Sequence, residues 1–356
     1  MRIVSVIAWG ILLLIVADAG RASAECRVEK GSAGSATFTV HLSQTCTQAE
    51  REAQAVSAQE LLHALASGKG IDLAGAVIQG DLFLDELPSQ KAGSLKDLTT
   101  EDQRLLEGLE GQEVHVIRGP FALKHVSVKG HILNRLKQGF LLVTGPVVLT
   151  DTHFNGALDL SRTVFLGVVD GSGATFDQES FFVQDQFTQG AIFSGTKFGP
   201  HVRFHRSQFG APAVFRGASF NGLSEFLEVV FTQDASFARA TFHMGTGFSG
   251  AECRGKCDFS GARFDREAFF LFARFHRPVT FAEARFGGQA DFSDALFLDN
   301  DDLAGAWFAR PPLLTRTIRP TAAMPGSSNG TASSQAVTVS LFLAALGLLL
   351  YLLKSR

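Results

Sequence analysis

Four cysteines carry the reactive chemistry that is easiest to recognise in this sequence, and they fall into two pairs. Cys26 and Cys46 lie near the N-terminus and could close a small loop, whereas Cys253 and Cys257 are close neighbours in the second half of the chain. Disulfides persist in oxidising compartments, so both pairs are possible disulfides of an exported protein. Spacing alone does not prove a pairing, and Cys253 and Cys257 could instead be buried thiols that pack as small apolar groups.

The remaining polar residues give little support for metal binding or catalysis. His201 and His205 have i, i+4 spacing, but this spacing brings two ligands together on a helix and not in strands and turns. The carboxylates of Asp301 and Asp302 fall in a predicted loop. The sequence contains no G-x-S-x-G, H-E-x-x-H, phosphate-binding-loop or dinucleotide-binding motif. We therefore expect no catalytic residue, no metal and no cofactor.

Phenylalanine sets the organisation of the chain, with 33 Phe against one Tyr and two Trp. From residue 154 to 308, Phe recurs at every eleventh position in two interleaved ladders, so the combined steps alternate between 5 and 6. Such a regular repeat indicates a solenoid. Cys253 takes the one missing place of the first ladder, while Phe181, Phe269 and Phe272 lie off both ladders. The expected core ladder includes Phe198, Phe204, Phe209, Phe215, Phe220, Phe226, Phe231, Phe237, Phe242, Phe248, Phe259 and Phe264.

A small or β-branched residue, often Ala, precedes most ladder positions by two, so that the unit reads A-x-F. On an α-helix, steps of 5 and 6 give no single apolar stripe, and the many Gly, Asp, Ser and Thr also disfavour a helix. We therefore expect very short strands and tight turns, with Ala and Phe pointing inward. Two 11-residue units make a 22-residue coil with four inward Phe. About seven such coils, stacked at roughly 4.8 Å, would extend about 34 Å.

Two segments show the repeat most clearly, because residues 290–295 read A-D-F-S-D-A and residues 257–262 read C-D-F-S-G-A. They resemble the A-[DN]-[LF]-x-x repeat of the pentapeptide-repeat family. The resemblance is close over residues 150–308 and loose over 71–150. It implies an all-β fold, a right-handed quadrilateral parallel β-helix. One inserted residue in every second unit departs from the family's pattern, and we expect a bulge or a wider corner on alternate sides.

The charge balance limits the partners that the resemblance would allow. Some members of the family mimic DNA and bind topoisomerases, which requires a strongly acidic protein in the cytoplasm. Residues 154–308 carry 18 Asp and Glu against 13 Lys and Arg, and the whole chain has a net charge of −3. Neither a DNA mimic nor a nucleic-acid-binding protein is therefore expected.

A short basic patch is predicted near the end of the repeats. Arg263 and Arg285 are one full coil apart and should stack on one face, with Arg274 on the opposite face. Such a patch could bind acidic envelope polymers or lipid headgroups. The alternative is a solvated face whose charge is balanced by nearby acids. These acids are Asp258, Asp265, Glu267 and Glu283.

The two ends of the sequence predict export and a membrane anchor. Residues 1–24 have the basic start, the apolar run and the A-x-A cleavage motif of a signal peptide, so the mature chain would begin at Glu25. Residues 336–353 are 18 uncharged residues that would form a helix about 27 Å long and span a bilayer. The basic residues 354–356 would stay in the cytoplasm. A buried core helix and a processed sorting signal are the alternatives. Without an LPxTG motif, we expect a retained span.

Between these ends the chain divides into several predicted segments. Ser57 and Glu60 form a capping box for a short helix. The segments are an N-terminal segment with this helical cap at 25–70, an irregular β-solenoid at 71–150 with an inserted excursion at 88–112, the Phe-cored β-helix at 151–308, and a flexible linker rich in Pro, Ser and Gly at 309–335.

These features predict a membrane-anchored, extracytoplasmic pentapeptide-repeat protein, with its body in the periplasm or at the cell surface. The C-terminal helix would contact the membrane, and the body would be a non-catalytic structural or protein-interaction surface for an unknown protein or envelope polymer. The alternative is an envelope carbohydrate-active enzyme that uses the excursion at 88–112 as a flap over a coil face.

Overall fold

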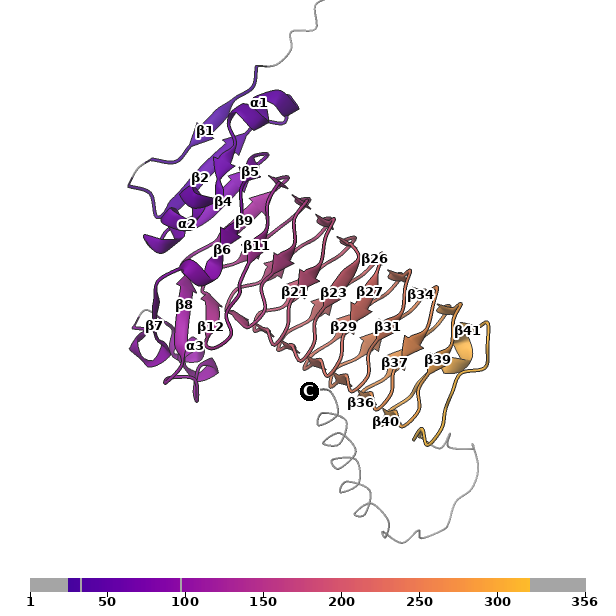
Figure 1. Ribbon diagram of the computed structural model, residues 1–356. Helices are drawn as coiled ribbons and strands as arrows, with labels where there is room; N and C mark the ends of the chain where they lie inside the picture. Colours follow the sequence, from indigo (N-terminus) through magenta and orange to yellow (C-terminus); the bar gives the residue numbers. More distant parts are fainter. Residues whose placement is uncertain (1–24, 33, 97, 321–356) are drawn as a thin grey trace, which may run out of the picture. The chain divides into compact units, whose positions relative to one another are not determined.

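The computed structural model describes residues 25–320, except for residues 33 and 97 (Figure 1). The predicted signal peptide, the predicted span at 336–353 and the basic tail lie outside the described residues. Within the described part of the chain, no helix is both long and apolar enough to cross a membrane. These residues form a parallel β-solenoid of about 11 turns with few helices, which confirms the predicted parallel β-solenoid.

Four sheets run along the solenoid. Sheet A contains β1 (Val28–Lys30), β2 (Thr37–Leu42), β4 (Gly70–Ala74), β9 (Phe121–Lys124), β13 (Val147–Val148), β17 (Val169–Asp170), β21 (Ala191–Ile192), β25 (Ala213–Val214), β29 (Ala235–Ser236), β33 (Cys257–Asp258) and β37 (Val279–Thr280). Sheet B contains β3 (Val56–Ser57), β5 (Val77–Gln79), β10 (Ser127–Val128), β14 (His153–Phe154), β18 (Thr175–Phe176), β22 (Lys197–Phe198), β26 (Ser219–Phe220), β30 (Thr241–Phe242), β34 (Arg263–Phe264), β38 (Arg285–Phe286) and β41 (Trp307–Phe308).

The other two sheets complete the four sides of the coils. Sheet C contains β6 (Leu82–Phe83), β11 (Ile132–Leu133), β15 (Leu158–Asp159), β19 (Ser180–Phe181), β23 (His201–Arg203), β27 (Leu223–Glu225), β31 (Thr246–Gly247), β35 (Ala268–Phe269) and β39 (Ala290–Asp291). Sheet D contains β7 (Ser89–Lys91), β8 (Glu113–Ile117), β12 (Phe140–Val143), β16 (Thr163–Phe165), β20 (Gln186–Phe187), β24 (Gln208–Phe209), β28 (Val230–Phe231), β32 (Glu252–Cys253), β36 (Arg274–Phe275) and β40 (Leu296–Phe297).

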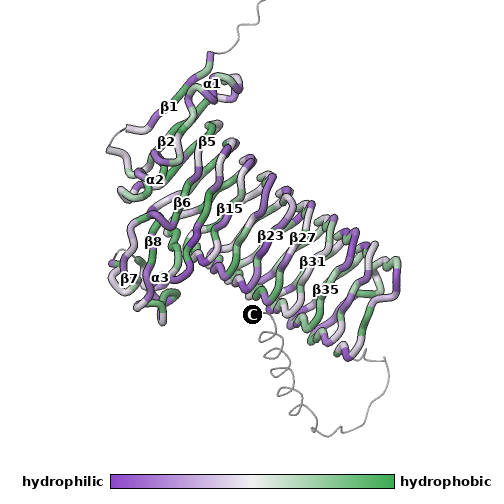
Figure 2. The backbone as a smooth tube through the Cα atoms, in the orientation of Figure 1, coloured by the Kyte–Doolittle hydropathy of each residue, from purple (hydrophilic) through white to green (hydrophobic). Residues whose placement is uncertain are grey.

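The coils are in register at the 22-residue spacing of the repeat. On sheet B, Phe198 pairs with Phe220, and Phe220 pairs with Phe242. Backbone hydrogen bonds join successive coils, such as the one that Asn221 N–H donates to the carbonyl of Phe198 (2.9 Å). Because alternate residues of a strand point to opposite faces, each ladder Phe points inward and the residue before or after it points outward. Hydrophobic and hydrophilic residues accordingly alternate along the coils in Figure 2.

Two kinds of corner alternate within each coil, and they explain the steps of 5 and 6. After a second-ladder Phe the chain makes a β-turn, in which Ala218 N–H donates to the carbonyl of Phe215 (3.1 Å). The third residue of this turn has a positive φ, 64° at Gly217. The other corner, for example residues 210–212, contains the extra residue of the 6-residue step. At Phe272 a side chain occupies the positive-φ position (φ 58°), where only glycine is unstrained.

The N-terminal segment, which includes the predicted helix, forms the first coil of the solenoid. β2 pairs in parallel with β4, and β1 pairs antiparallel with β2. The helices α1 (Gln48–Ala53) and α2 (Ala58–Ala66) follow, and the capping box of α2 uses Ser57 and Glu60. The predicted start of the solenoid at residue 71 is therefore too late, because this coil is made of a hairpin and helices and lacks the Phe repeat.

The excursion at 88–112 covers the outside of sheet D. It contains β7, the 3-10 helix η2 (Ala92–Ser94) and α3 (Thr100–Leu105), and it follows another short 3-10 helix, η1 (Leu84–Glu86). Its apolar residues pack with outward residues of the first sheet D strands in a second, smaller core. That core contains Ala92, Leu106, Val114, Phe140, Leu142, Val164 and Leu166. The excursion is therefore packed on sheet D and does not overhang an open coil face as a flap would.

The solenoid also extends further than predicted at its C-terminal end. Leu313 and Ile318 bridge to Asp291 and Leu296 of the preceding coil, after the 3-10 helix η3 (Leu303–Gly305) and β41. The predicted linker at 309–335 therefore begins about ten residues too early. The Pro-rich composition concealed this last coil, because a terminal coil packs on one side only and does not need the full Phe repeat.

Candidate functional site

Stacked phenylalanine rings fill the inside of the coils. All twelve residues of the expected core ladder are buried. Rings in equivalent places of successive coils stack on each other, with centroids 4.5 Å apart for Phe187 and Phe209 and 5.1 Å apart for Phe204 and Phe226. Rings from opposite sides also meet edge to face across the core, as do Phe215, which follows a strand of sheet A, and Phe226, which follows a strand of sheet C. Because this core is occupied by side chains, binding chemistry has to use the outer surface and the two ends.

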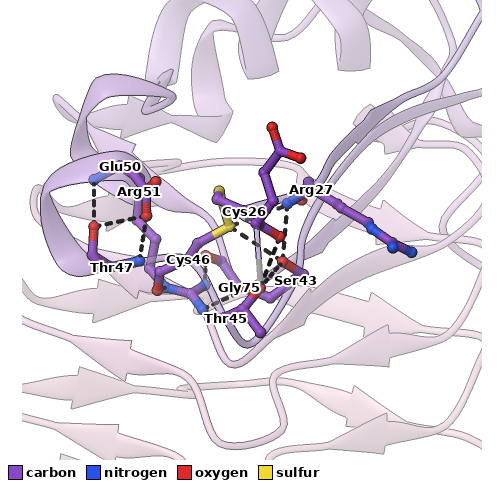
Figure 3. Close-up of a disulfide and its surroundings, with 10 residues drawn as sticks. Cys26, Arg27, Ser43, Thr45, Cys46, Thr47, Glu50, Arg51 and Gly75 are labelled. Carbon is purple, nitrogen blue, oxygen red and sulfur yellow. Dashed lines mark hydrogen bonds between the residues drawn. A yellow bond between two sulfur atoms is a disulfide. The ribbon is translucent and has the colours of Figure 1, made fainter. Parts of the chain in front are cut away.

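One disulfide fastens the N-terminal segment to the turn before α1 (Figure 3). It joins Cys26 to Cys46. Next to it, the guanidinium of Arg51 donates to the carbonyls of Cys46 (3.1 Å) and Ser43 (2.9 Å) and also contacts the carbonyl of Gly75 in the next coil. The disulfide and Arg51 together connect the hairpin, α1 and the following coil.

The second disulfide lies inside the repeat and joins Cys253 to Cys257. Cys253 takes the ladder place between Phe231 and Phe275 on sheet D, and Cys257 takes the small-residue place after Ala235 on sheet A. Both side chains are buried. The bond therefore crosses the corner between sheets D and A inside the core, where a redox reagent has little access.

In the described part of the chain, the polar residues form no group of metal ligands. Over residues 25–320, apart from the two undescribed positions, no group of three or more His, Cys, Asp or Glu could hold a metal ion. His201 pairs with Glu225 (3.3 Å) and His205 pairs with Glu228 (3.9 Å), so the structure does not bring the two histidines to one ligand. The hydrogen bonds from Arg206 lower the pKa of Glu228. These histidine side chains lie at the surface and contact carboxylates of the next coil.

Asp185 is the one buried carboxyl group with an unusual environment among the described residues. It takes an inward place that Thr163 and Ser207 take in the coils on either side. Its Oδ1 accepts the N–H of Thr163 (2.9 Å), whereas its Oδ2 has no hydrogen-bond partner in the described part of the chain. Burial raises the pKa of Asp185 well above its ordinary value of 3.8, and nearby Asp159 adds to this rise. Because the side chain is sealed from solvent, it is not a reactive site.

The basic patch near the end of the repeats has the predicted arrangement. Arg263 and Arg285 are register partners on sheet B, and Arg274 lies on sheet D. Arg263 forms an ion pair with Asp265, whereas Arg285 has no ion pair within the described residues. The next residue in this outward column is Trp307. Arg285 and Trp307, with Arg239 and Glu283, line a shallow depression.

The residues that the sequence reasoning missed lie in the last coil. Trp307, Leu313 and Ile318 take outward places on sheets B, C and D, and they are 56%, 46% and 61% exposed. Trp307 already lies in the 22-residue register directly before Phe308, and the register continued past residue 308 would have found Leu313 and Ile318. Asp185 was missed for a similar reason, because its inward place appears only when it is aligned with Thr163 and Ser207.

The fold and its core define the class of this protein, a four-sided β-solenoid built from short repeats. A family model described as pentapeptide repeats (9 copies) matches residues 160–208, 204–252, 248–296 and 259–307. These matches show that residues 160–307 are pentapeptide repeats, which confirms the resemblance of the repeats to that family. No curated protein and no solved structure matches the sequence.

Proposed function

We propose that this chain is a membrane-anchored, extracytoplasmic pentapeptide-repeat protein whose solenoid is a non-catalytic surface for contacts with a protein or an envelope polymer. The observation that carries the proposal is that all four cysteines form disulfides in a solenoid whose inside is filled with Phe. The disulfides support an oxidising compartment, and the filled core leaves the outer faces for binding.

Two sequence features support the route to that compartment. Residues 1–24 have the pattern of a signal peptide, and residues 336–353 have the length and composition of a retained membrane span. The proposed topology places the solenoid outside the membrane and residues 354–356 in the cytoplasm.

The outward positions of a single coil allow a direct test of the surface. Val214, Ser219, Glu225 and Val230 point outward on sheets A, B, C and D of one coil. A photo-crosslinking amino acid is placed at each position in turn, in the full chain in its own membranes. Because a partner covers a contiguous area, we expect adducts from one or two adjacent sides and none from the opposite side.

Two results would contradict the proposal. Equal adduct formation from all four sides, or from none, would mean that no specific surface is used. Turnover of an envelope polysaccharide that is lost on changing one exposed carboxylate, such as Glu283, would show an enzyme instead. The matched control for that assay is Asp185, whose buried carboxyl cannot reach a polysaccharide.

A further inference from the structure

The outer surface of the solenoid changes character in its last coil. On sheet B the outward column runs Arg263, Arg285, Trp307, and on sheet C it runs from Asp291 to Leu313. Ile318 takes the corresponding place on sheet D. Large apolar side chains thus replace charged ones on two sides and occupy a third. Only sheet A keeps a polar side chain at this level.

The open end of the core lies at the same level. Phe308 stacks on Phe286 with ring centroids 4.8 Å apart, and no further ring covers its other face in the described part of the chain. Leu314 takes a ladder place but is 39% exposed. The exposed apolar groups therefore form a belt around the last coil together with the end of the core, and they do not form a patch on one side.

The shape of this belt distinguishes between possible occupants. A second copy stacked end to end would cover Phe308 and Leu314 but would leave Trp307 and Ile318 in water. A protein docked on one side would cover a single sheet. A lipid surface is fluid and can surround the end of the solenoid, so it can cover the belt and the core end together. Trp is also enriched where membranes meet water, because its ring is apolar and its N–H is polar.

The chain that follows the last coil keeps it close to the predicted span. Fifteen residues, 321–335, connect Pro320 to the apolar segment 336–353. Even fully extended, 15 residues reach at most about 54 Å. Residues 303–335 contain three Arg and no Asp or Glu, a balance that suits anionic headgroups. Two of these arginines pair with Asp294 and Asp301, while the third, Arg310, is exposed and has no ion pair within the described residues.

We infer that the last coil, residues 307–320, rests in the headgroup region of the membrane that holds residues 336–353. Trp307, Leu313, Leu314 and Ile318 lie among the headgroups and the first acyl carbons, where water still reaches the free backbone groups of the coil. Arg310 faces lipid phosphates. This inference rests on the proposed membrane anchor, and it adds that the solenoid stands on the membrane by its C-terminal end.

Trp307 is a built-in reporter for this contact. The sequence has two tryptophans, and Trp9 lies in the predicted signal peptide. A full chain carrying Trp9→Phe therefore has Trp307 as its sole tryptophan. It is reconstituted in vesicles of phosphatidylcholine and phosphatidylglycerol, with and without acyl chains brominated near the headgroup. We expect blue-shifted Trp307 emission that falls about twofold with the brominated lipid and does not change when the protein is diluted in lipid.

Two variants and two controls make the test decisive. Leu313→Ser with Ile318→Ser should abolish the quenching by lipid, while Phe269→Ser, an exposed apolar residue two coils earlier, should leave it unchanged. Circular dichroism verifies that each variant keeps its strands. If the chain still floats with the vesicles but Trp307 is quenched by aqueous acrylamide and not by brominated lipid, the inference is overturned and the proposed anchor is not affected. Emission that shifts with protein dilution would overturn it in favour of a second copy. Failure to float would refute the anchor itself.

Discussion

Phe226, in the middle of the stack, gives the sharpest prediction about stability. Its ring is fully buried, stacks on Phe204 and Phe248 at 5.1 and 4.8 Å, and meets Phe215 and Phe237 edge to face. Replacing a buried Phe by Ala costs about 3–5 kcal/mol, and the two lost stacked pairs place Phe226→Ala near the top of that range. Each coil is stabilised only by its neighbours, so the defect should also divide one unfolding transition into two.

Urea unfolding of the purified chain, followed by far-UV circular dichroism, measures both effects. The matched control is Phe269→Ala, because Phe269 points outward on sheet C and should cost less than about 1 kcal/mol. Asn221→Asp, at an exposed corner, should change the free energy of unfolding even less. Phe226→Asp should prevent cooperative unfolding altogether, because it buries a charge. Equal and small losses for Phe226→Ala and Phe269→Ala would refute the register of the ladder.

Three further predictions concern a buried acid, a strained turn and the internal disulfide. Burial raises the pKa of Asp185, so above pH 3.8 the folded state holds a proton that the unfolded state has lost. The contribution of Asp185 to the free energy of unfolding therefore falls as the pH rises above 3.8. Asp185→Ser should therefore stabilise the chain at pH 7 by about 1–3 kcal/mol in urea unfolding, and the gain should shrink towards pH 3.8; a gain that does not depend on pH would contradict the argument. Phe272→Gly should raise the stability by about 1 kcal/mol because it removes a side chain from a positive-φ position. Gly217→Ala should lower the stability by a similar amount, although its added Cβ would meet no atom within 4 Å. Thermal melts in which both variants have a lower melting temperature would contradict the argument from turn strain. The double variant Cys253→Phe, Cys257→Ala restores the repeat, and its melting temperature should be the same with and without a reductant. Ala at both positions should instead lower the stability by about 2–5 kcal/mol.

The repeat made the solenoid predictable, because each inward position recurs many times. The ladder residues from Phe154 to Phe297 are buried, and Phe269 and Phe272, which lie off the ladders, are exposed. The two ends were harder to predict. An end coil packs against only one neighbouring coil, so its sequence does not need to follow the repeat. The pairing of β2 with β4 joins distant segments that no local pattern relates. Leu313 and Ile318 keep the 22-residue spacing, but Leu314 and Arg319 follow them where the repeat would place Phe.

The candidate sites within the repeats were also easier to predict than those outside them. The 22-residue spacing alone predicted that Arg263 and Arg285 lie on the same face. The packing of the 88–112 excursion on sheet D was not predictable, because its apolar residues are scattered and their partners lie in distant strands. Trp307 follows Arg263 and Arg285 at the same 22-residue spacing, so the register also places it at the end of the arginine column.

The intact mass of the protein extracted from the membranes of the cells that make it, after alkylation of free thiols, tests the proposed function most directly. We expect a membrane-bound chain of residues 25–356 in which no cysteine is alkylated, because the signal peptide is removed, both disulfides form and the span is retained. A chain that retains residues 1–24, leaves the membranes in the soluble fraction and carries four alkylated cysteines would contradict export, oxidation and anchoring at once.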